Sequence, residues 1–324
     1  MAQSAETGCA IFFWWLDIFR PPAQPARMTA DRPLLGIALM MGFCVLAPLA
    51  DAVAKIVGVT VPILELIMIR FLFQALLMPP VMVTGGLKPL PRKTLLRIVL
   101  RTVLHIIGIG CMFTGLKYLP LADAVAIAFV MPFIMLLLGK VFLGEEVGPR
   151  RLIACAIGFI GTLLVLQPAF ADTGWPALLP LCVAVVFALF MLVTRQIAKE
   201  VDAVPLQAIS GVIAVILLLP VWVYLGAPSP FRFDGTTLWL LVAIGVLGTG
   251  GHLLMTWALR FAPAASLAPM QYLEIPMATL FGYLIFSDLP GPMASIGIAL
   301  TIAAGVYIIL RERAMYQARP AAPI

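Results

Sequence analysis

Apolar residues run along the chain in long blocks, and short polar stretches separate the blocks. A helix needs about 20 mainly apolar residues to cross a hydrocarbon core about 30 Å thick. The connections, such as TGGLKPLPRK and GAPSPFRFDG, are rich in the glycine and proline of turns. This pattern predicts an all-α membrane protein with ten transmembrane helices, at residues 34–54, 62–83, 95–116, 121–142, 151–168, 176–197, 205–225, 237–259, 264–286 and 292–310.

Composition supports a membrane protein and excludes several other classes. Hydrophobic residues make up 63% of the chain and charged residues 11%, far from the make-up of soluble domains. The net charge of +6 comes from basic residues scattered singly between apolar blocks, so nucleic-acid binding is not expected. The five cysteines form no CxxC and the two histidines lie far apart. We therefore expect no disulfide framework, no metal site and no cofactor.

The distribution of lysine and arginine predicts the orientation. If the amino terminus is cytoplasmic, 17 basic residues fall on that side and three on the other, with Arg70 inside a span. The cytoplasmic set is Arg20, Arg27, Arg32, Lys88, Arg92, Lys93, Arg97, Arg101, Lys140, Arg150, Arg151, Arg195, Lys199, Arg260, Arg311, Arg313 and Arg319, and the opposite set is Lys55, Lys117 and Arg232. Positive residues collect on the cytoplasmic face, so both termini are predicted to lie there.

The N-terminal stretch at 1–33 forms a separate segment. CAIFFWWLDIF is apolar but too short to span, and it has no basic leader or small-residue cleavage site. One interpretation places it in the membrane interface with Trp14 and Trp15 as anchors. The alternative is an over-long reading frame whose native start is Met28.

One constant shift, which carries Pro62 onto Pro205, aligns the second half of the chain with the first. We therefore expect one repeat at 34–168 and another at 176–310, with terminal segments at 1–33 and 311–324. Five spans in each repeat force the second to enter the membrane from the other side, an architecture typical of alternating-access transporters. The aligned residues include Val61-Pro62 with Val204-Pro205, Gly108 with Gly251, Met112 with Met255, Pro120 with Pro263, and Gly148-Pro149 with Gly291-Pro292.

Arg70 and Glu274 are predicted to lie near mid-membrane, in the second and ninth spans. A lone guanidinium there costs at least about 2.5 kcal/mol, so it needs a partner or a wet cavity. Our hypothesis places both in one central cavity, where Arg70 holds substrate and Glu274 carries a coupling proton. The alternative is a static ion pair that fixes the packing of the two helices.

Other polar side chains also fall within the spans. His105 and His252 suit a proton relay or a donor to substrate, and the plainer interpretation is a hydrogen bond to a neighbouring helix. Gln74, Gln271 and Tyr272 are further candidates for polar contacts with substrate.

Prolines interrupt two spans at corresponding places in the repeats. Pro132 and Pro276 lie about midway along the fourth and ninth spans. A mid-helix proline frees a backbone carbonyl and bends the helix, which the bilayer tolerates against protein or water. We expect these two helices to line the cavity, and the alternative is an ordinary kink.

The heptapeptide PLADAVA occurs at residues 48–54 and again at 120–126. The spacing of the copies differs from the repeat shift, so they are not duplicated modules. Asp123 is predicted at a helix start, where a negative charge is favoured. Asp51 is predicted near a helix end, paired with Lys55 four residues on. A role in an outer vestibule is open for all three residues.

Several stretches resemble the ten-helix drug and metabolite transporters with two EamA-type repeats. They are IRFLFQALLMPP, LKYLPLADAVAIAFVMPFIMLLLGKVFLGEE and LRFAPAASLAPMQYLEIPMATLFGYLIFSD, within a match from about Pro33 to Leu310. The second copy departs from the family pattern by ending in FSDLPG. The resemblance implies a secondary carrier of small metabolites in a bacterial inner membrane. PLADAVAK and QYLEIP are most similar to the branch that includes riboflavin importers.

We thus expect a carrier, not an enzyme, since the chain has neither HExxH nor GxxxxGK[ST]. Its expected substrate is a small polar or amphiphilic metabolite, with uptake of a vitamin such as riboflavin first and export of amino acids or related metabolites as the alternative. An alternative of another class is a non-transporting scaffold or sensor, which the short loops disfavour. Protons and the lipid bilayer are expected partners, in a monomer or homodimer.

Overall fold

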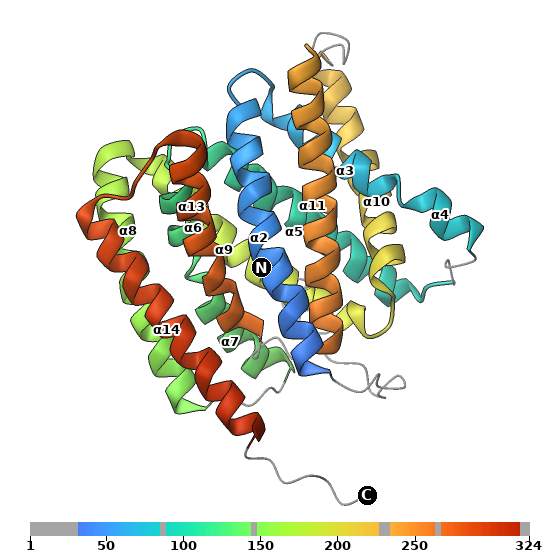
Figure 1. Cartoon of the computed structure of the whole chain (residues 1–324). Coiled ribbons are helices and arrows are strands. Elements are labelled where there is room, and N and C mark those ends of the chain that lie inside the picture. Colours follow the sequence, from blue (N-terminus) through green and yellow to red (C-terminus); the bar gives the residue numbers. More distant parts are fainter. Residues whose placement is uncertain (1–31, 85–88, 144–147, 227–233, 263–266, 318–324) are drawn as a thin grey trace, which may run out of the picture.

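The computed structural model describes residues 32–84, 89–143, 148–226, 234–262 and 267–317, and these residues form helices joined by short turns, without a β-strand. Figure 1 shows the helices as one bundle. In chain order they are α2 (Pro33–Val57), α3 (Ile63–Ala75), α4 (Met78–Val83), α5 (Arg92–Gly115), α6 (Leu121–Ala128), α7 (Met131–Leu143), α8 (Pro149–Thr173), η1 (Trp175–Leu178), α9 (Leu179–Ala198), α10 (Ala203–Tyr224), α11 (Gly235–Phe261), η3 (Ala268–Leu273), α13 (Glu274–Phe286) and α14 (Pro292–Gln317).

The described residues include eight helical stretches that are long and apolar enough to cross a membrane. They correspond to the first eight expected spans, counting α3 with α4, α6 with α7, and η1 with α9. The ninth expected span is divided between η3 and α13, and the tenth is α14, whose apolar part is Pro292–Tyr307. The chain is therefore an all-helical, multi-pass membrane protein.

The structure describes part of the expected C-terminal tail. Helix α14 continues to Gln317, so much of the expected tail at 311–324 extends the last helix. The interfacial segment CAIFFWWLDIF and the alternative start at Met28 lie outside the described residues.

The fourth and ninth spans are both interrupted. Helix α6 ends at Ala128 and α7 begins at Met131, while η3 gives way to α13 at Glu274. The repeat shift carries Phe129 and Val130 onto Tyr272 and Leu273, so the two breaks correspond. Pro132 and Pro276 lie in the first turns of α7 and α13, where a missing N–H breaks no helical hydrogen bond. The prolines thus begin new helical segments instead of bending continuous ones.

The packing of the helices repeats under the same shift. It carries the start of α5 at Arg92 onto the start of α11 at Gly235, and the start of α8 at Pro149 onto that of α14 at Pro292. The shift relates α2 to α9 and α5 to α11, so the contact of α2 with α11 exchanges with the contact of α9 with α5. It also relates α7 to α13, so the contact of α13 with α2 exchanges with the contact of α7 with α9. Helices α3 and α10 contact each other, as do α8 and α14. These exchanges are those of a two-fold relation between the halves.

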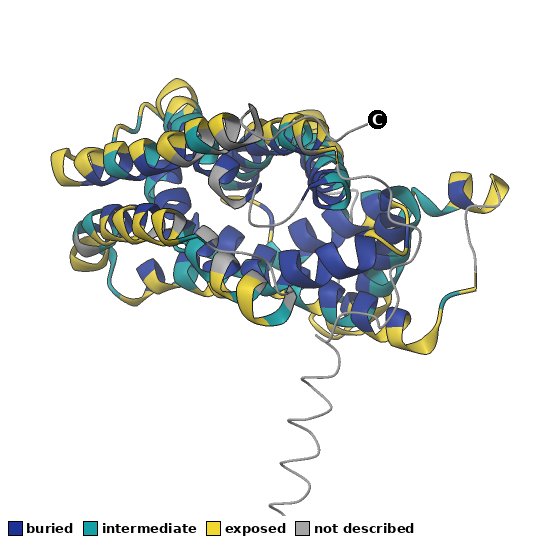
Figure 2. Ribbon diagram, turned by 90° about the horizontal axis from the view of Figure 1, so that it is seen from below, coloured by how far each residue is buried: buried dark blue, intermediate teal, exposed yellow. Residues whose placement is uncertain are grey.

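Burial separates a polar-containing interior from an apolar exterior. In Figure 2, buried residues gather between the helices and exposed residues lie on the outer faces. Large exposed side chains include Ile153, Ile216, Trp239 and Leu284. In a soluble protein such apolar surface would be an association site, whereas in a membrane protein it faces lipid.

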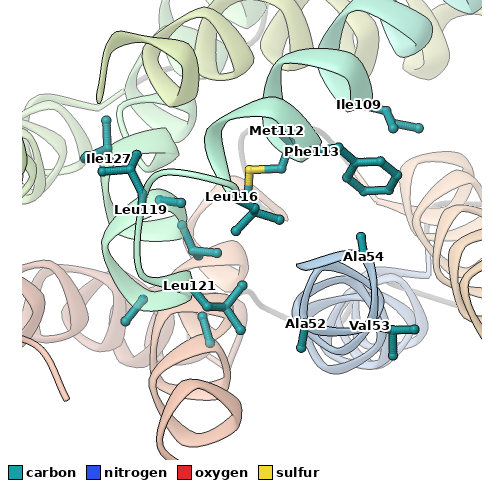
Figure 3. Close-up of a cluster of buried hydrophobic side chains, with 14 of the residues drawn as sticks. Ala52, Val53, Ala54, Ile109, Met112, Phe113, Leu116, Leu119, Leu121 and Ile127 are labelled. Atoms are coloured by element: carbon teal, nitrogen blue, oxygen red, sulfur yellow. The ribbon is translucent and has the colours of Figure 1, made fainter. Parts of the chain in front are cut away.

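One apolar cluster holds the α5–α6 turn against α2 (Figure 3). Leu116 and Leu119 come from the turn, Leu121 from the start of α6, and Ala52 and Ala54 from α2. All five side chains are buried. Because Asp51 and Lys55 are on the same stretch of α2, this cluster fixes where these charged residues lie.

Candidate functional site

Polar side chains from five helices are buried in the interior of the bundle. Burial of such groups is stable when each finds a hydrogen-bond partner. The set consists of Gln74 on α3, Arg101 and His105 on α5, Thr194 on α9, Gln207 and Ser210 on α10, and His252 and Thr256 on α11.

His105 and His252 contact each other, with their Nε2 atoms 3.2 Å apart. A neutral imidazole has one donor and one acceptor nitrogen, so one Nε2–H donates to the other Nε2. Four aromatic rings surround the pair, from Phe43, Phe71, Phe187 and Phe190. The two histidines therefore join the two halves of the chain through one hydrogen bond in an apolar setting.

Gln74 belongs to a chain of hydrogen bonds that ends at His252. Its amide donates to the Gln207 side-chain oxygen, Gln207 Nε2 donates to Thr256 Oγ1 at 3.0 Å, and Thr256 Oγ1 donates to the His252 carbonyl at 2.7 Å. Gly211 permits this approach of α3 and α10, since an added methyl group would overlap the Ala75 backbone. Gln74 thus holds helices together in this conformation and is committed to protein partners.

Arg70 lies on α3 against α11 and is 7% exposed. Its guanidinium occupies the space that a side chain at Gly248 would fill. Asp51 is its electrostatic partner, although no ion-pair contact joins them among the described residues. The guanidinium also makes no hydrogen bond among the described residues, so its donors are available there.

Glu274 is the first residue of α13 and is half-buried. It makes no ion pair with Arg70, so the alternative of a static Arg70–Glu274 pair is wrong for this conformation. Its contact is with Cys44 Sγ, 4.0 Å from Oε1, and Asp51 acts on it as a nearby like charge. Asp51 therefore interacts with both residues: Arg70 attracts its carboxylate, and a charged Glu274 repels it.

The predicted pairing of Asp51 with Lys55 is wrong. Lys55 Nζ lies 3.6 Å from Asp288 and donates to the Leu119 carbonyl at 2.9 Å. It also lies over the Phe286 ring, 5.0 Å from its centre. Lys55 therefore binds residues that are distant in sequence instead of Asp51, which is one helical turn away. Asp51 remains available to interact with groups inside the bundle.

Asp123 lies in the first turn of α6, so the prediction of a helix-start acid is confirmed. It also acts electrostatically on Lys55. Asp123, Lys55 and Asp288 therefore form a charged group at the end of the bundle where α2 and α13 finish, away from Arg70.

Gln271 and Tyr272 precede the break before α13 and are both buried. Gln271 Nε2 lies 3.2 Å from Met191 Sδ, and Gln271 Oε1 has no partner among the described residues. The Tyr272 ring packs on Phe129 at 5.5 Å and against Gly158 and Gly305. Gln271 keeps an acceptor for a ligand, whereas the Tyr272 ring is fixed by packing.

Sequence reasoning missed Arg101 as an interior residue and assigned it to the cytoplasmic face. The side chain is completely buried, and Nε and Nη1 donate to Thr194 Oγ1 at 2.9 Å and Ser210 Oγ at 2.8 Å. Nine residues after Arg92, at 1.5 Å per residue, it lies about 13.5 Å along the helix. That depth is the signal that could have identified it. Removing it from the count leaves 16 basic residues against three, so the predicted orientation is unchanged.

Comparison with known proteins agrees with this architecture. Models of the EamA-like transporter family match residues 34–167 and 174–311. A riboflavin transporter of Rhizobium johnstonii is 32% identical over 213 residues, which cover 65% of this chain and 69% of the relative. An S-adenosylmethionine uptake transporter of Rickettsia felis is 26% identical, over 86% of this chain and 94% of the relative.

Two further comparisons extend the range of relatives. A pseudopaline exporter of Pseudomonas aeruginosa is 27% identical, over 80% of this chain and 88% of that protein. A solved crystal structure superposes with a TM-score of 0.63 at 18% identity, covering 87% of this chain and 98% of the other, which supports the fold alone. With two matched segments spanning most of its length, the chain belongs to the EamA-like transporter family and is a small-metabolite transporter.

Proposed function

We propose that the chain is a secondary carrier that takes up a small amphiphilic metabolite, first a flavin, across the bacterial inner membrane. The observation that carries this proposal is Arg70, an interior guanidinium that makes no ion-pair contact among the described residues and has Asp51 as its electrostatic neighbour at the junction of the two halves. A charged group inside the membrane marks a substrate or ion pathway. The site would be exposed to the two sides in turn by movement of one repeat against the other.

Arg70 would bind polar groups of the substrate. Its donors are not committed to acceptors in the described part of the chain, in contrast to the side chain of Gln74. Gln271 would add an acceptor through its unpartnered Oε1. Aromatic rings around the neighbouring histidines, from Phe43, Phe71, Phe187 and Phe190, suit a flat heteroaromatic ring.

Glu274 would carry the coupling proton. No described lysine, arginine or histidine forms an ion pair with it, and it lies near the like charge of Asp51. Loading a proton on Glu274 removes this repulsion, and releasing it restores the repulsion. A cycle of this kind would link proton movement to the occupancy of the Arg70 site.

The relatives favour a flavin first and leave direction to experiment. Riboflavin transporters of two organisms support a flavin as the substrate. The relative that exports pseudopaline favours a second candidate, export of amino-acid-like metabolites. The excess of basic residues on one face supports cytoplasmic termini in either case.

Reconstitution in liposomes tests the proposal. The full chain is expected to move radiolabelled riboflavin faster than empty liposomes do, and Arg70→Gln is expected to abolish this flux. Lys117→Gln is the matched control, because Lys117 is an exposed basic residue outside the site. Folded wild-type protein that moves neither riboflavin nor any of a broad panel of amino acids and vitamins would contradict the carrier proposal and favour a scaffold or sensor.

A further inference from the structure

Arg101 is a completely buried cation that the proposed transport cycle leaves without a role. It reaches from α5 to hydroxyls on α9 and α10, those of Thr194 and Ser210. Its guanidinium carbon lies 4.6 Å from the centre of the Phe190 ring, which also packs against His105 at 4.7 Å. The side chain is therefore next to the histidine pair on the inner side of the bundle.

Charge compensation distinguishes Arg101 from Arg70, Arg97 and Arg260. Arg97 lies 3.5 Å from Glu200, Arg260 contacts Asp202, and Arg70 has Asp51 as its electrostatic partner. In the part of the chain that the structure describes, Arg101 makes no contact with a carboxylate, and no acidic group acts on it electrostatically. A buried charge without a counter-charge is unfavourable unless a ligand supplies one.

Two hydrogen-bond donors at this site, Arg101 Nη2 and the Ser210 hydroxyl, have no acceptor among the described residues. Arg101 Nη2 is buried and has no partner among the described residues. Thr194 uses its own proton on the Phe190 carbonyl at 2.6 Å. Ser210 accepts from Arg101, and no described acceptor takes its hydroxyl proton. The guanidinium and the Ser210 hydroxyl thus offer two donors to one anionic oxygen.

We propose that Arg101 and Ser210 form a subsite for an oxyanion, a carboxylate or phosphate group, of the transported solute. The inference rests on the proposed carrier function and narrows its substrate class. Riboflavin itself carries neither group, so the subsite favours a phosphorylated flavin or an amino-acid-like solute over riboflavin. Binding the oxyanion supplies the counter-charge that the described residues do not provide, and Arg101 forms hydrogen bonds with it that a neutral solute cannot match in strength. The subsite is closed in this conformation, so the anion enters when α5, α9 and α10 separate.

Thermal unfolding of the purified full-length protein tests the subsite without requiring transport. Nicotinate and nicotinamide share a pyridine ring and differ in a carboxylate or a carboxamide, and inorganic phosphate serves as a second oxyanion. At constant ionic strength, nicotinate or phosphate is expected to raise the wild-type Tm by about 2–4 °C more than nicotinamide does. The oxyanion that stabilises the protein identifies the anionic group.

Variants separate binding from a structural role. Arg101→Gln is expected to lose the extra stabilisation, and Ser210→Ala, the second variant should Arg101→Gln fail to fold, to reduce it. Thr102→Val is the matched control, because its buried hydroxyl donates within α5 to the Ile98 carbonyl at 2.8 Å, and it is expected to respond like the wild type. A purely structural Arg101 would lower the stability of the ligand-free protein without changing its response to oxyanions.

Two results would overturn the subsite: equal stabilisation of the wild type by all three probes, or an undiminished oxyanion response in Arg101→Gln. Solute flux in liposomes is measured separately and tests the carrier function. Oxyanion stabilisation that depends on Arg101, without flux of any solute, keeps the subsite and removes the carrier function. Flux with no such stabilisation removes the subsite alone.

Discussion

His105 and His252 join α5 to α11 through a contact of 3.2 Å between their Nε2 atoms. In the frame of the repeat shift, His252 corresponds to Ile109, one helical turn from His105. Equivalent helices of the two repeats thus supply the two partners of one buried hydrogen bond.

The histidine pair is predicted to stabilise the fold as a unit. His252→Leu leaves His105 Nε2 without a partner, so we expect a loss of about 1–3 kcal/mol of unfolding free energy. His105→Leu should cost a similar amount, and the double variant less than the sum, by about 0.5–3 kcal/mol. Denaturant unfolding in detergent measures all three. Additive losses would mean that the contact contributes no coupling energy.

Gly248 is predicted to be required for the position of Arg70. A methyl group there overlaps the guanidinium, so Gly248→Ala should displace it and lower flux about tenfold, equivalent to ~1.4 kcal/mol. Gly250→Ala on the same helix is the control, since its methyl would meet only Leu46 Cδ1 at 3.8 Å. Equal flux in both variants, measured in liposomes, would show that Arg70 does not need this space.

The sequence predicts the course of the chain better than the directions of its side chains. Apolar block length and the constant register of the repeats are strong signals, because lipid requires about 20 apolar residues per span. These signals place His105 and His252 on equivalent helices, one turn apart in the repeat register. They do not reveal that the two side chains are in contact. Helices that are apolar on most sides carry little information on which face turns inward.

Arg101 and Lys55 illustrate that limit. A basic residue near the end of a span can extend to the membrane surface, and hydropathy does not distinguish this from the buried Arg101. Spacing of four residues predicted that Lys55 pairs with Asp51, yet Asp288 and the Leu119 carbonyl, distant in sequence, are its partners. The contacts that Arg101 and Lys55 make with distant residues are tertiary effects, which no local pattern contains.

Cys111 and Cys182 are predicted to form a disulfide on mild oxidation. Their Sγ atoms lie 3.6 Å apart on α5 and α9, and Cys182 is exposed. Copper phenanthroline should accept two electrons from the two thiols, which release their two protons to solvent as the S–S bond forms. Peptide mass spectrometry detects the cross-link. Cys182→Ser is the control that should give none. Failure of the wild type to cross-link would contradict this packing of α5 on α9.

Asp234 is predicted to hold the start of α11 in a pH-dependent way. Hydrogen bonds from Thr237, including its backbone N–H at 3.0 Å, keep the pKa of Asp234 below its ordinary value. A depressed pKa in the folded state stabilises it above the unfolded value, about 3.9, and this stabilisation is lost as pH falls. Asp234→Ala should lower Tm more at pH 7 than below pH 3, because the carboxylate accepts from Thr237 more strongly than the protonated carboxyl does, while Asp234→Asn keeps a neutral cap. An equal loss at both pH values would contradict the role of the charge.

Glu274 is predicted to couple flux to the proton gradient. In wild-type liposomes, an inward proton gradient should accelerate uptake, since protonation removes the repulsion between Glu274 and Asp51. Glu274→Gln mimics the protonated form permanently, so uptake driven by a gradient should fall to the rate without one, while exchange of substrate across the membrane continues. Asp234→Asn, an acid changed at an exposed helix start, should respond like the wild type. Because the gradient is the only variable between paired measurements, an unchanged response of Glu274→Gln would assign the proton to another group, with Asp51 the next to be replaced.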